Sequence, residues 1–280
     1  MAGFFGLFDY TKEGPGVEKN GKKKKGFFAF FEIFFRNFWS FAKIGPVYWL
    51  CSLLVFSNGI AKLGMTHVAR SISREKHSFI FSDFFETIKK NLKQGVILGV
   101  LNTLAMALLA LDIWYFWGYV NYEFSMMSVI GLALAFFLAV CLTFMKYYIW
   151  TMAITFNLTI KQLIKNSFNF VFLNLGRNLL ISITMGIIYV GLYFLAATNG
   201  LLFILAAVLL IFVVPGFKTS LIQVNTFPSI KKFIIDPYYN EHKGEDIEKR
   251  LSLGLEISDE EMADYKKSDE SVFSDETVEN

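Results

Sequence analysis

The sequence predicts an all-α, polytopic integral membrane protein with about six helical membrane passes. Of its 280 residues, 54% are hydrophobic and 18% aromatic, which is too apolar for an ordinary soluble chain. Several stretches contain about 20 mostly apolar residues, enough to cross a hydrocarbon core of about 30 Å. Residues 1–235 carry 22 Lys and Arg against 9 Asp and Glu, whereas residues 236–280 carry 5 against 15. A basic, apolar body therefore precedes an acidic tail.

This charge distribution divides the chain into three parts. Residues 1–26 form a basic cytoplasmic segment that ends in four lysines at positions 22–25, and residues 27–235 form the helical membrane domain. Residues 236–280 form an acidic cytoplasmic tail. Beyond residue 243 the tail is too charged to bury much surface, so we expect it to be partly disordered.

The first hydrophobic region, residues 27–57, would be about 46 Å long as one straight helix, so it cannot all run perpendicular to the membrane. Glu32, Arg36, Ser40 and Lys43 share one helical stripe, and Pro46 can kink the helix that follows. We therefore expect an interfacial start and a crossing end. The return through residues 59–72 is short, so residues 46–72 form either two shielded helices or a re-entrant hairpin.

Four later stretches satisfy the length and composition of a transmembrane helix: residues 95–117, 126–149, 178–198 and 201–221. An aromatic cluster between Trp114 and Tyr122 marks one membrane surface. The short connections after the first and third of these spans carry no Lys or Arg, whereas segments 73–94 and 146–177 are basic. The positive-inside rule then places the basic segments and both termini in the cytoplasm.

Two segments are expected to lie on the cytoplasmic face as amphipathic helices. One covers residues 82–94, with Ser82 as a candidate cap, and the other covers residues 159–172. Each precedes a pair of spans and contains a Lys-Asn pair, at Lys90-Asn91 and Lys165-Asn166. This is either a faint internal repeat or two basic connectors of separate origin.

A family resemblance is carried by the run from Gly59 to Gly95, which resembles the YesL family of bacterial membrane proteins, a domain of unknown function (DUF624). The matching residues are Gly59, Arg74, Glu75, Phe81, Phe84, Phe85, Lys90, Asn91, Lys93 and Gln94. The resemblance extends over residues 27–240, with departures at Leu54 and at Ser57-Asn58. It implies a multi-pass protein of the bacterial plasma membrane, often encoded near carbohydrate uptake genes, and it transfers no catalytic residue.

The sequence contains no soluble-enzyme motif, so we expect no catalytic, cofactor-binding or metal site. Ionisable and polar residues within spans are the remaining candidates, because burying them is costly. We single out Lys43, Lys62, Asn102 and Asp112. Asp112 and Lys62 either pair near the outer surface and only join two helices, or they belong to a polar vestibule for a hydroxyl-rich or ionic ligand.

Two functions remain for the protein. The first is a non-catalytic accessory or regulatory role beside a carbohydrate importer of the ABC type or another membrane protein, with membrane lipids as further partners. The second is a small transporter or channel for a polar solute. Nucleic-acid binding is excluded because the basic residues flank membrane segments, and the sequence specifies no oligomeric state.

Overall fold

The computed structural model describes residues 27–54, 56–74, 79–122 and 124–241, together with residues 247 and 262. The basic residues 22–25 and nearly all of the acidic tail therefore lie outside the described residues. The described chain is helical, and the early helices are α1 (Phe27–Arg36), α2 (Phe38–Cys51), α3 (Asn58–Ser73), α4 (Ile80–Lys90), α5 (Leu92–Tyr122) and α6 (Met126–Ala153). There follow α7 (Ile160–Leu173), α8 (Leu175–Thr198), α9 (Gly200–Val208), the π-helical turn η1 (Leu209–Val213), α10 (Val214–Ile230), the π-helical turn η2 (Lys231–Ile235) and α11 (Asp236–Glu241).

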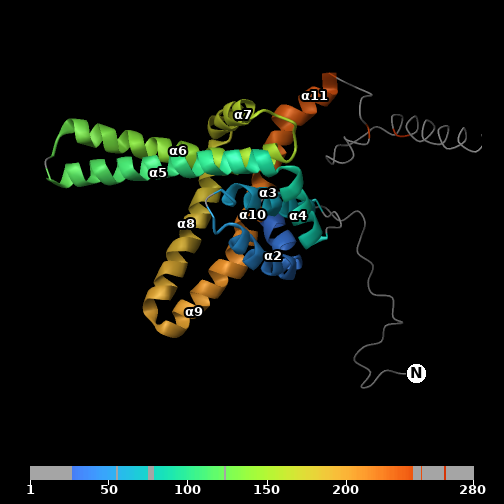
Figure 1. Cartoon of the computed structure of the whole chain (residues 1–280), viewed down its shortest axis with the longest axis horizontal. Coiled ribbons are helices and arrows are strands. Elements are labelled where there is room, and N and C mark those ends of the chain that lie inside the picture. The colour runs from blue at the N-terminus through green and yellow to red at the C-terminus, as the bar shows by residue number, and fades with distance from the viewer. Residues whose placement is uncertain are drawn as a thin grey trace, which may run out of the picture.

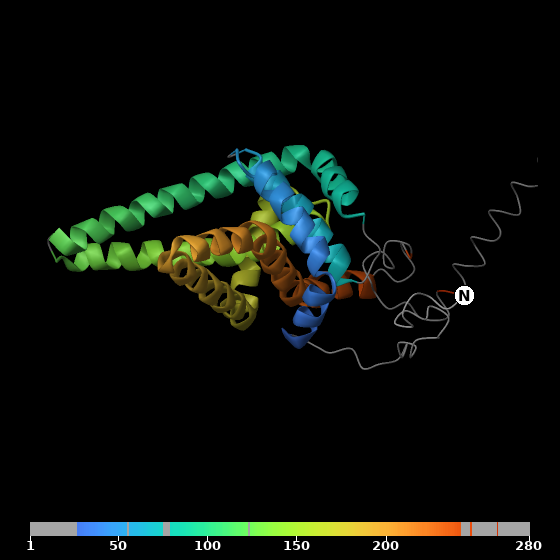
Figure 2. The same ribbon diagram turned by 90° about the horizontal axis from the view of Figure 1, so that it is seen from below.

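These helices form three consecutive units of the same design. Each unit has a short helix, a one-residue break, an outgoing helix and a returning helix: α1, α2 and α3; then α4, α5 and α6; then α7, α8 and the helices from α9 to α11. The α5–α6 and α8–α9 hairpins extend in different directions from a central group that contains α2, α3, α4 and α10 (Figures 1 and 2). The internal repeat suggested by the sequence is present as element order, and it occurs three times.

An asparagine makes the break in every unit. Asn37, Asn91 and Asn174 have φ values of −109°, −116° and −128° and ψ values of 21°, 21° and 36°. This conformation lies in the sparsely populated bridge region between helix and strand. The backbone N–H of each asparagine still donates to the carbonyl four residues earlier, at 3.2, 3.1 and 3.3 Å. Each residue therefore ends one helix and starts the next with a change of direction.

The side chains explain the choice of residue at the first two breaks. Asn37 Nδ2 donates to the Ile33 carbonyl at 2.9 Å, and Asn91 Nδ2 donates to the Thr87 carbonyl at 3.0 Å. A short amide that bonds its own backbone stabilises a non-helical conformation. The chain turns at Asn37, nine residues before Pro46, and Pro46 itself lies inside α2. The sequence comparison matched Asn91 with Asn166. In the structure Asn91 corresponds instead to Asn174, and Asn166 lies inside α7.

Four helices are long and apolar enough to cross a membrane: Leu92–Tyr122, Met126–Ala153, Leu175–Thr198 and the continuous helix Gly200–Tyr239. These contain the four predicted spans. The protein is thus a polytopic helical membrane protein. The last of these helices continues past the predicted domain boundary at residue 235.

The α2–α3 hairpin is shorter than these spans, with helices of 14 and 16 residues. Near its tip, Trp49 Nε1 donates to the Leu210 carbonyl at 3.2 Å. Leu210 lies ten residues, about 15 Å, from the start of α9 at Gly200. The hairpin therefore ends well short of the α8–α9 turn, which favours the re-entrant alternative over two full passes.

The hairpin is seated by a contact between glycines. A Cβ atom added to Gly59 would lie 2.6 Å from Gly99 Cα and 2.7 Å from Gly99 N, and closer still to the Gly95 carbonyl oxygen. Only residues without side chains allow α3 and α5 to approach so closely. The small-residue pattern Gly95-x-x-x-Gly99 therefore packs within one chain.

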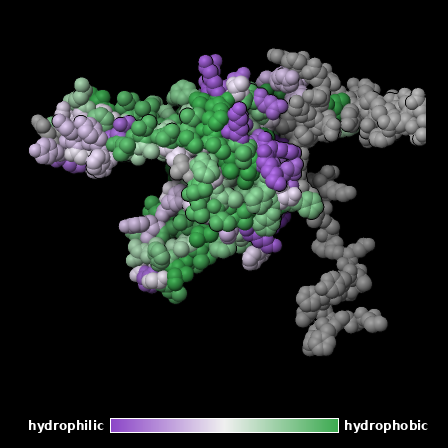
Figure 3. Space-filling view, in the orientation of Figure 1, coloured by the Kyte–Doolittle hydropathy of each residue, from purple (hydrophilic) through white to green (hydrophobic). Residues whose placement is uncertain are grey.

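The short helices place their polar sides away from this packing. Apolar residues cover the two long hairpins, and polar residues gather around the short helices and at the left-hand end of the α5–α6 hairpin (Figure 3). Thr159, the first residue of the predicted segment 159–172, caps α7 in a reciprocal arrangement with Gln162. The predicted cap at Ser82 is wrong: α4 begins two residues earlier at Ile80, so Ser82 lies inside the helix.

Candidate functional site

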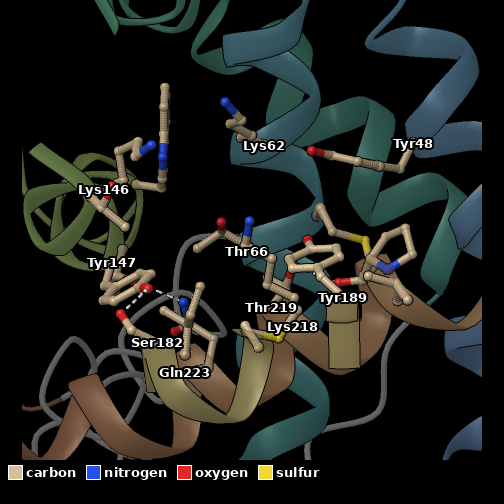
Figure 4. A pocket seen from close by; sticks show the side chains of 18 of the residues that line it. Tyr48, Lys62, Thr66, Lys146, Tyr147, Ser182, Tyr189, Lys218, Thr219 and Gln223 are labelled. Atoms are coloured by element: carbon tan, nitrogen blue, oxygen red, sulfur yellow. Dashed lines mark hydrogen bonds between the residues drawn. The ribbon is translucent and has the colours of Figure 1, made fainter. Parts of the chain in front are cut away.

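The centre of the molecule contains one lysine from the returning helix of each unit: Lys62 of α3, Lys146 of α6 and Lys218 of α10. The three returning helices contact one another, so residues 156 positions apart in the sequence line one cavity of about 420 Å³. Figure 4 shows the three lysines arriving from different helices around this cavity. The charge on Lys62 interacts with those on Lys146 and Lys218, and Lys146 also interacts with Lys218.

These charges have no acidic partner among the described residues. The residues that line the cavity include neither Asp nor Glu. Lys62 Nζ lies 5.3 Å from the centre of the Trp150 ring, and Lys146 Nζ lies 3.6 Å from Met106 Sδ. A cation over an aromatic face is stabilised by the ring quadrupole, but no described ion pair neutralises any of the three lysines.

Aromatic and hydroxyl side chains form most of the remaining wall. Tyr147 Oη and Ser182 Oγ are hydrogen-bonded at 2.8 Å, which joins α6 to α8 beside the lysines (Figure 4). The other aromatic and hydroxyl-bearing lining residues are Tyr48, Trp49, Trp150, Tyr189, Thr66, Thr143, Thr151 and Thr219. Flat apolar faces and hydroxyl groups together suit a ligand that has both ring or carbon surface and polar substituents.

A group of buried polar residues holds the third unit in place. Asn178 is fully buried and accepts a hydrogen bond from Tyr148 Oη at 2.7 Å, while its amide donates to the Phe170 and Val171 carbonyls. Arg177 donates to Ser229 Oγ at 2.6 Å. These bonds join α6, α7, α8 and α10, so the helices that carry Lys146 and Lys218 have a defined relative position.

Two further arginines, Arg70 and Arg74, lie at the end of α3. Arg70 donates to Thr155 Oγ1 at 2.7 Å and to the Ile154 carbonyl at 3.4 Å, so it binds the end of α6. The guanidinium of Arg74 lies 3.9 Å from the Phe227 ring centre. Burial lowers the pKa of Arg74 to about 10, so this side chain stays protonated at neutral pH.

Only one of the four candidate residues reaches the cavity. Lys62 lines it, whereas Lys43 is exposed on α2, Asp112 is exposed on α5, and Asn102 is half-buried on α5. In the described part of the chain no ion pair joins Lys62 to Asp112. The alternative in which Lys62 pairs with Asp112 is not present: Lys62 Nζ lies over the Trp150 ring, and Asp112 is exposed on α5.

The sequence interpretation missed Lys146 and Lys218. Lys146 was assigned to a basic cytoplasmic segment, but it lies inside α6, seven residues before the end of that helix. Lys218 lay within a predicted span and was not singled out. The available signal was one lysine within each returning apolar helix, a position that is costly unless it has a role.

Comparison with known proteins supports the family resemblance. Residues 41–113 match the model of the family described as Protein of unknown function, DUF624. Over this segment the chain is similar to the DUF624 family. No curated protein and no solved structure matches the chain.

The DUF624 segment covers most of α2 and α5 and all of α3 and α4. It therefore contains the α2–α3 hairpin, the glycines that seat it and Lys62. Lys146 and Lys218 come from helices that follow the segment. The cavity is completed only when the second and third units pack against it.

Proposed function

We propose that this protein is a non-catalytic membrane protein that binds a small hydroxylated organic polyanion, such as a sugar phosphate or a hydroxy-tricarboxylate, in its central cavity. One observation carries the proposal: three lysines meet in a cavity that has no acidic lining residue among those described. The proposal includes the bacterial plasma membrane as its location and a cytoplasmic position for both termini.

The charge of the site supports an anionic ligand. Like charges that share a low-dielectric site repel one another and lose hydration, so the ligand-free state carries an electrostatic cost. A ligand with two or three negative charges offsets this cost, and a neutral ligand does not. We therefore expect the net negative charge of a ligand to be the main determinant of its affinity for the cavity.

The size and wall of the site support an organic ligand. A volume of about 420 Å³ is much larger than a bare phosphate needs and lies within the range of small-molecule sites. The hydroxyls of Thr66, Thr219 and Ser182 supply donors and acceptors, and Trp150 supplies a flat face. A phosphorylated or carboxylated polyol uses all of these groups.

This site serves either of the two functions that the sequence left open. A transporter needs a polar binding site within the membrane, which this cavity would supply. An accessory protein beside a carbohydrate importer would use the same cavity to sense an anionic metabolite. That accessory role rests on the family resemblance alone, so the cavity favours direct solute handling.

The test is a binding titration with the full chain in detergent. Glucose 6-phosphate and citrate are added separately while tryptophan fluorescence is followed, because Trp49 and Trp150 both line the cavity. We expect both anions to bind and uncharged glucose to bind far more weakly. A second titration in bicelles that contain phosphatidylglycerol shows whether a lipid headgroup occupies the same site.

Substitution of the lysines then identifies the site. Lys62→Met, Lys146→Met or Lys218→Met should each weaken anion binding roughly ten- to hundredfold, the effect of losing one charge-assisted contact. Lys43→Met is the matched control, because Lys43 is an exposed lysine of α2. Equal affinity for glucose and its phosphate, or an equal loss in the Lys43 variant, would refute the proposed site.

A further inference from the structure

We infer that the lysine cavity is the first part of an anion path, and that Gln223 separates it from a second basic cavity at the end of the bundle where α1 and α3 meet α10. This inference rests on the proposed function, because it concerns the route by which an anion enters or leaves the same site. Gln223 lines both cavities, which makes it the shared wall between them.

The second cavity continues the positive charge of the first. It has a volume of about 160 Å³, and Arg70, Arg74 and Ser73 line it together with Phe227. It too has no acidic residue among those that line it. Two adjacent cavities with the same sign of charge form a low-energy route for an anion and a barrier for a cation.

The two cavities follow one another along α10. Lys218, Gln223 and Phe227 are separated by five and four residues, which corresponds to about 7.5 Å and 6 Å along a helix. Thr155, which binds Arg70, follows the end of α6. The path thus leads from the centre of the bundle to the end that the sequence places at the cytoplasmic surface.

Gln223 has the features of a constriction that can bind a passing anion. Its side chain is 2% exposed, and its Nε2 donates to Thr151 Oγ1 at 2.7 Å. Its Oε1 atom is buried and has no hydrogen-bond partner. An unsatisfied buried amide oxygen is costly, and a rotation of the amide would direct Nε2 to an anion in either cavity.

This geometry predicts that the charge at position 223 controls which ions pass. The experiment places a cysteine at Thr219, which lines the lysine cavity, in a chain that carries Cys51→Ser and Cys141→Ala. Two impermeant thiol reagents of similar size are compared, the anionic sulfonatoethyl and the cationic trimethylammonium-ethyl methanethiosulfonate. Each is added separately to either face of sealed membrane vesicles.

We expect the anionic reagent to react faster than the cationic one from the face at which a cysteine at Lys165 also reacts. Gln223→Glu should lower the ratio of the anionic to the cationic rate about tenfold, and Gln223→Lys should raise it, because one charge in a narrow low-dielectric path shifts the two barriers in opposite directions. Gln223→Ala should accelerate both reagents. The ratio of the anionic to the cationic rate is measured within one vesicle preparation, so it does not depend on the fraction of protein that is folded.

The outcome separates this inference from the proposed function. If the rate ratio is the same for Glu, Gln and Lys at position 223, the path does not run past this residue, and the inference is overturned. Glucose 6-phosphate titrations of the lysine variants are independent of these rates. Intact lysine-dependent binding with an unchanged rate ratio therefore removes only the path, whereas loss of the lysine dependence removes the binding site itself.

Discussion

Replacing Gly59 by alanine tests the packing that seats the α2–α3 hairpin and Lys62. The new Cβ would lie 2.6 Å from Gly99 Cα and 2.7 Å from Gly99 N, whereas carbon atoms pack favourably at about 3.5–4.0 Å. Both contacted atoms belong to the backbone of α5, so no side chain can rotate away. Helix α3 must therefore move by about 1 Å.

The size of the effect follows from two opposing contributions. Gly→Ala in a helix gains up to about 1 kcal/mol from propensity and from the unfolded state. Overpacking a close contact costs about 1–3 kcal/mol. The net expectation for Gly59→Ala is a loss of about 1–2 kcal/mol, which corresponds to a fall of roughly 3–6 °C in the unfolding midpoint.

The matched control is Gly191→Ala. Gly191 lies inside α8, and an added Cβ would have no neighbour within 4 Å. This variant should be neutral or slightly stabilised. Unfolding midpoints of both variants would be measured in the same detergent by tryptophan fluorescence. Glucose 6-phosphate binding would then be measured, and it should weaken in Gly59→Ala because Lys62 is three residues from the substituted position. Equal midpoints for the two variants would show that the close contact between α3 and α5 does not exist.

Two further predictions concern orientation and the asparagine breaks. A cysteine at Asn121 should react with an impermeant thiol reagent added outside intact cells, and one at Lys165 should not; the reverse pattern would invert the predicted orientation. Asn91→Ala should lower the free energy of unfolding by about 0.5–1.5 kcal/mol, because the hydrogen bond from Asn91 Nδ2 to the Thr87 carbonyl is lost. The control, Asp112→Asn, changes an exposed residue and should leave the unfolding midpoint unchanged. Similar unfolding midpoints for these two variants would contradict the role of Asn91.

Much of the fold was predictable because its causes are local in the sequence. The four spans are long, mostly apolar stretches. A stretch of that length and composition favours the hydrocarbon core of a membrane whatever its tertiary contacts. The cap at Thr159 is likewise local, since Thr159 and Gln162 are one helical turn apart. The break at Asn37 was missed because Pro46 is the stronger general signal for a kink. The common role of Asn37, Asn91 and Asn174 is visible only once their backbone angles are compared.

The sequence by itself determined that this chain is a helical membrane protein with an apolar body and an acidic tail, because composition and hydrophobic length decide that. Only the tertiary structure decided that Lys62, Lys146 and Lys218 share one cavity and that Gln223 lines both this cavity and the smaller one beside it. A lysine in an apolar helix has the same local sequence whether it extends to the membrane surface or faces the bundle centre. The direction it takes depends on the rotation of each helix about its axis, and close contacts between residues far apart in the chain, such as Gly59 with Gly99, determine that rotation.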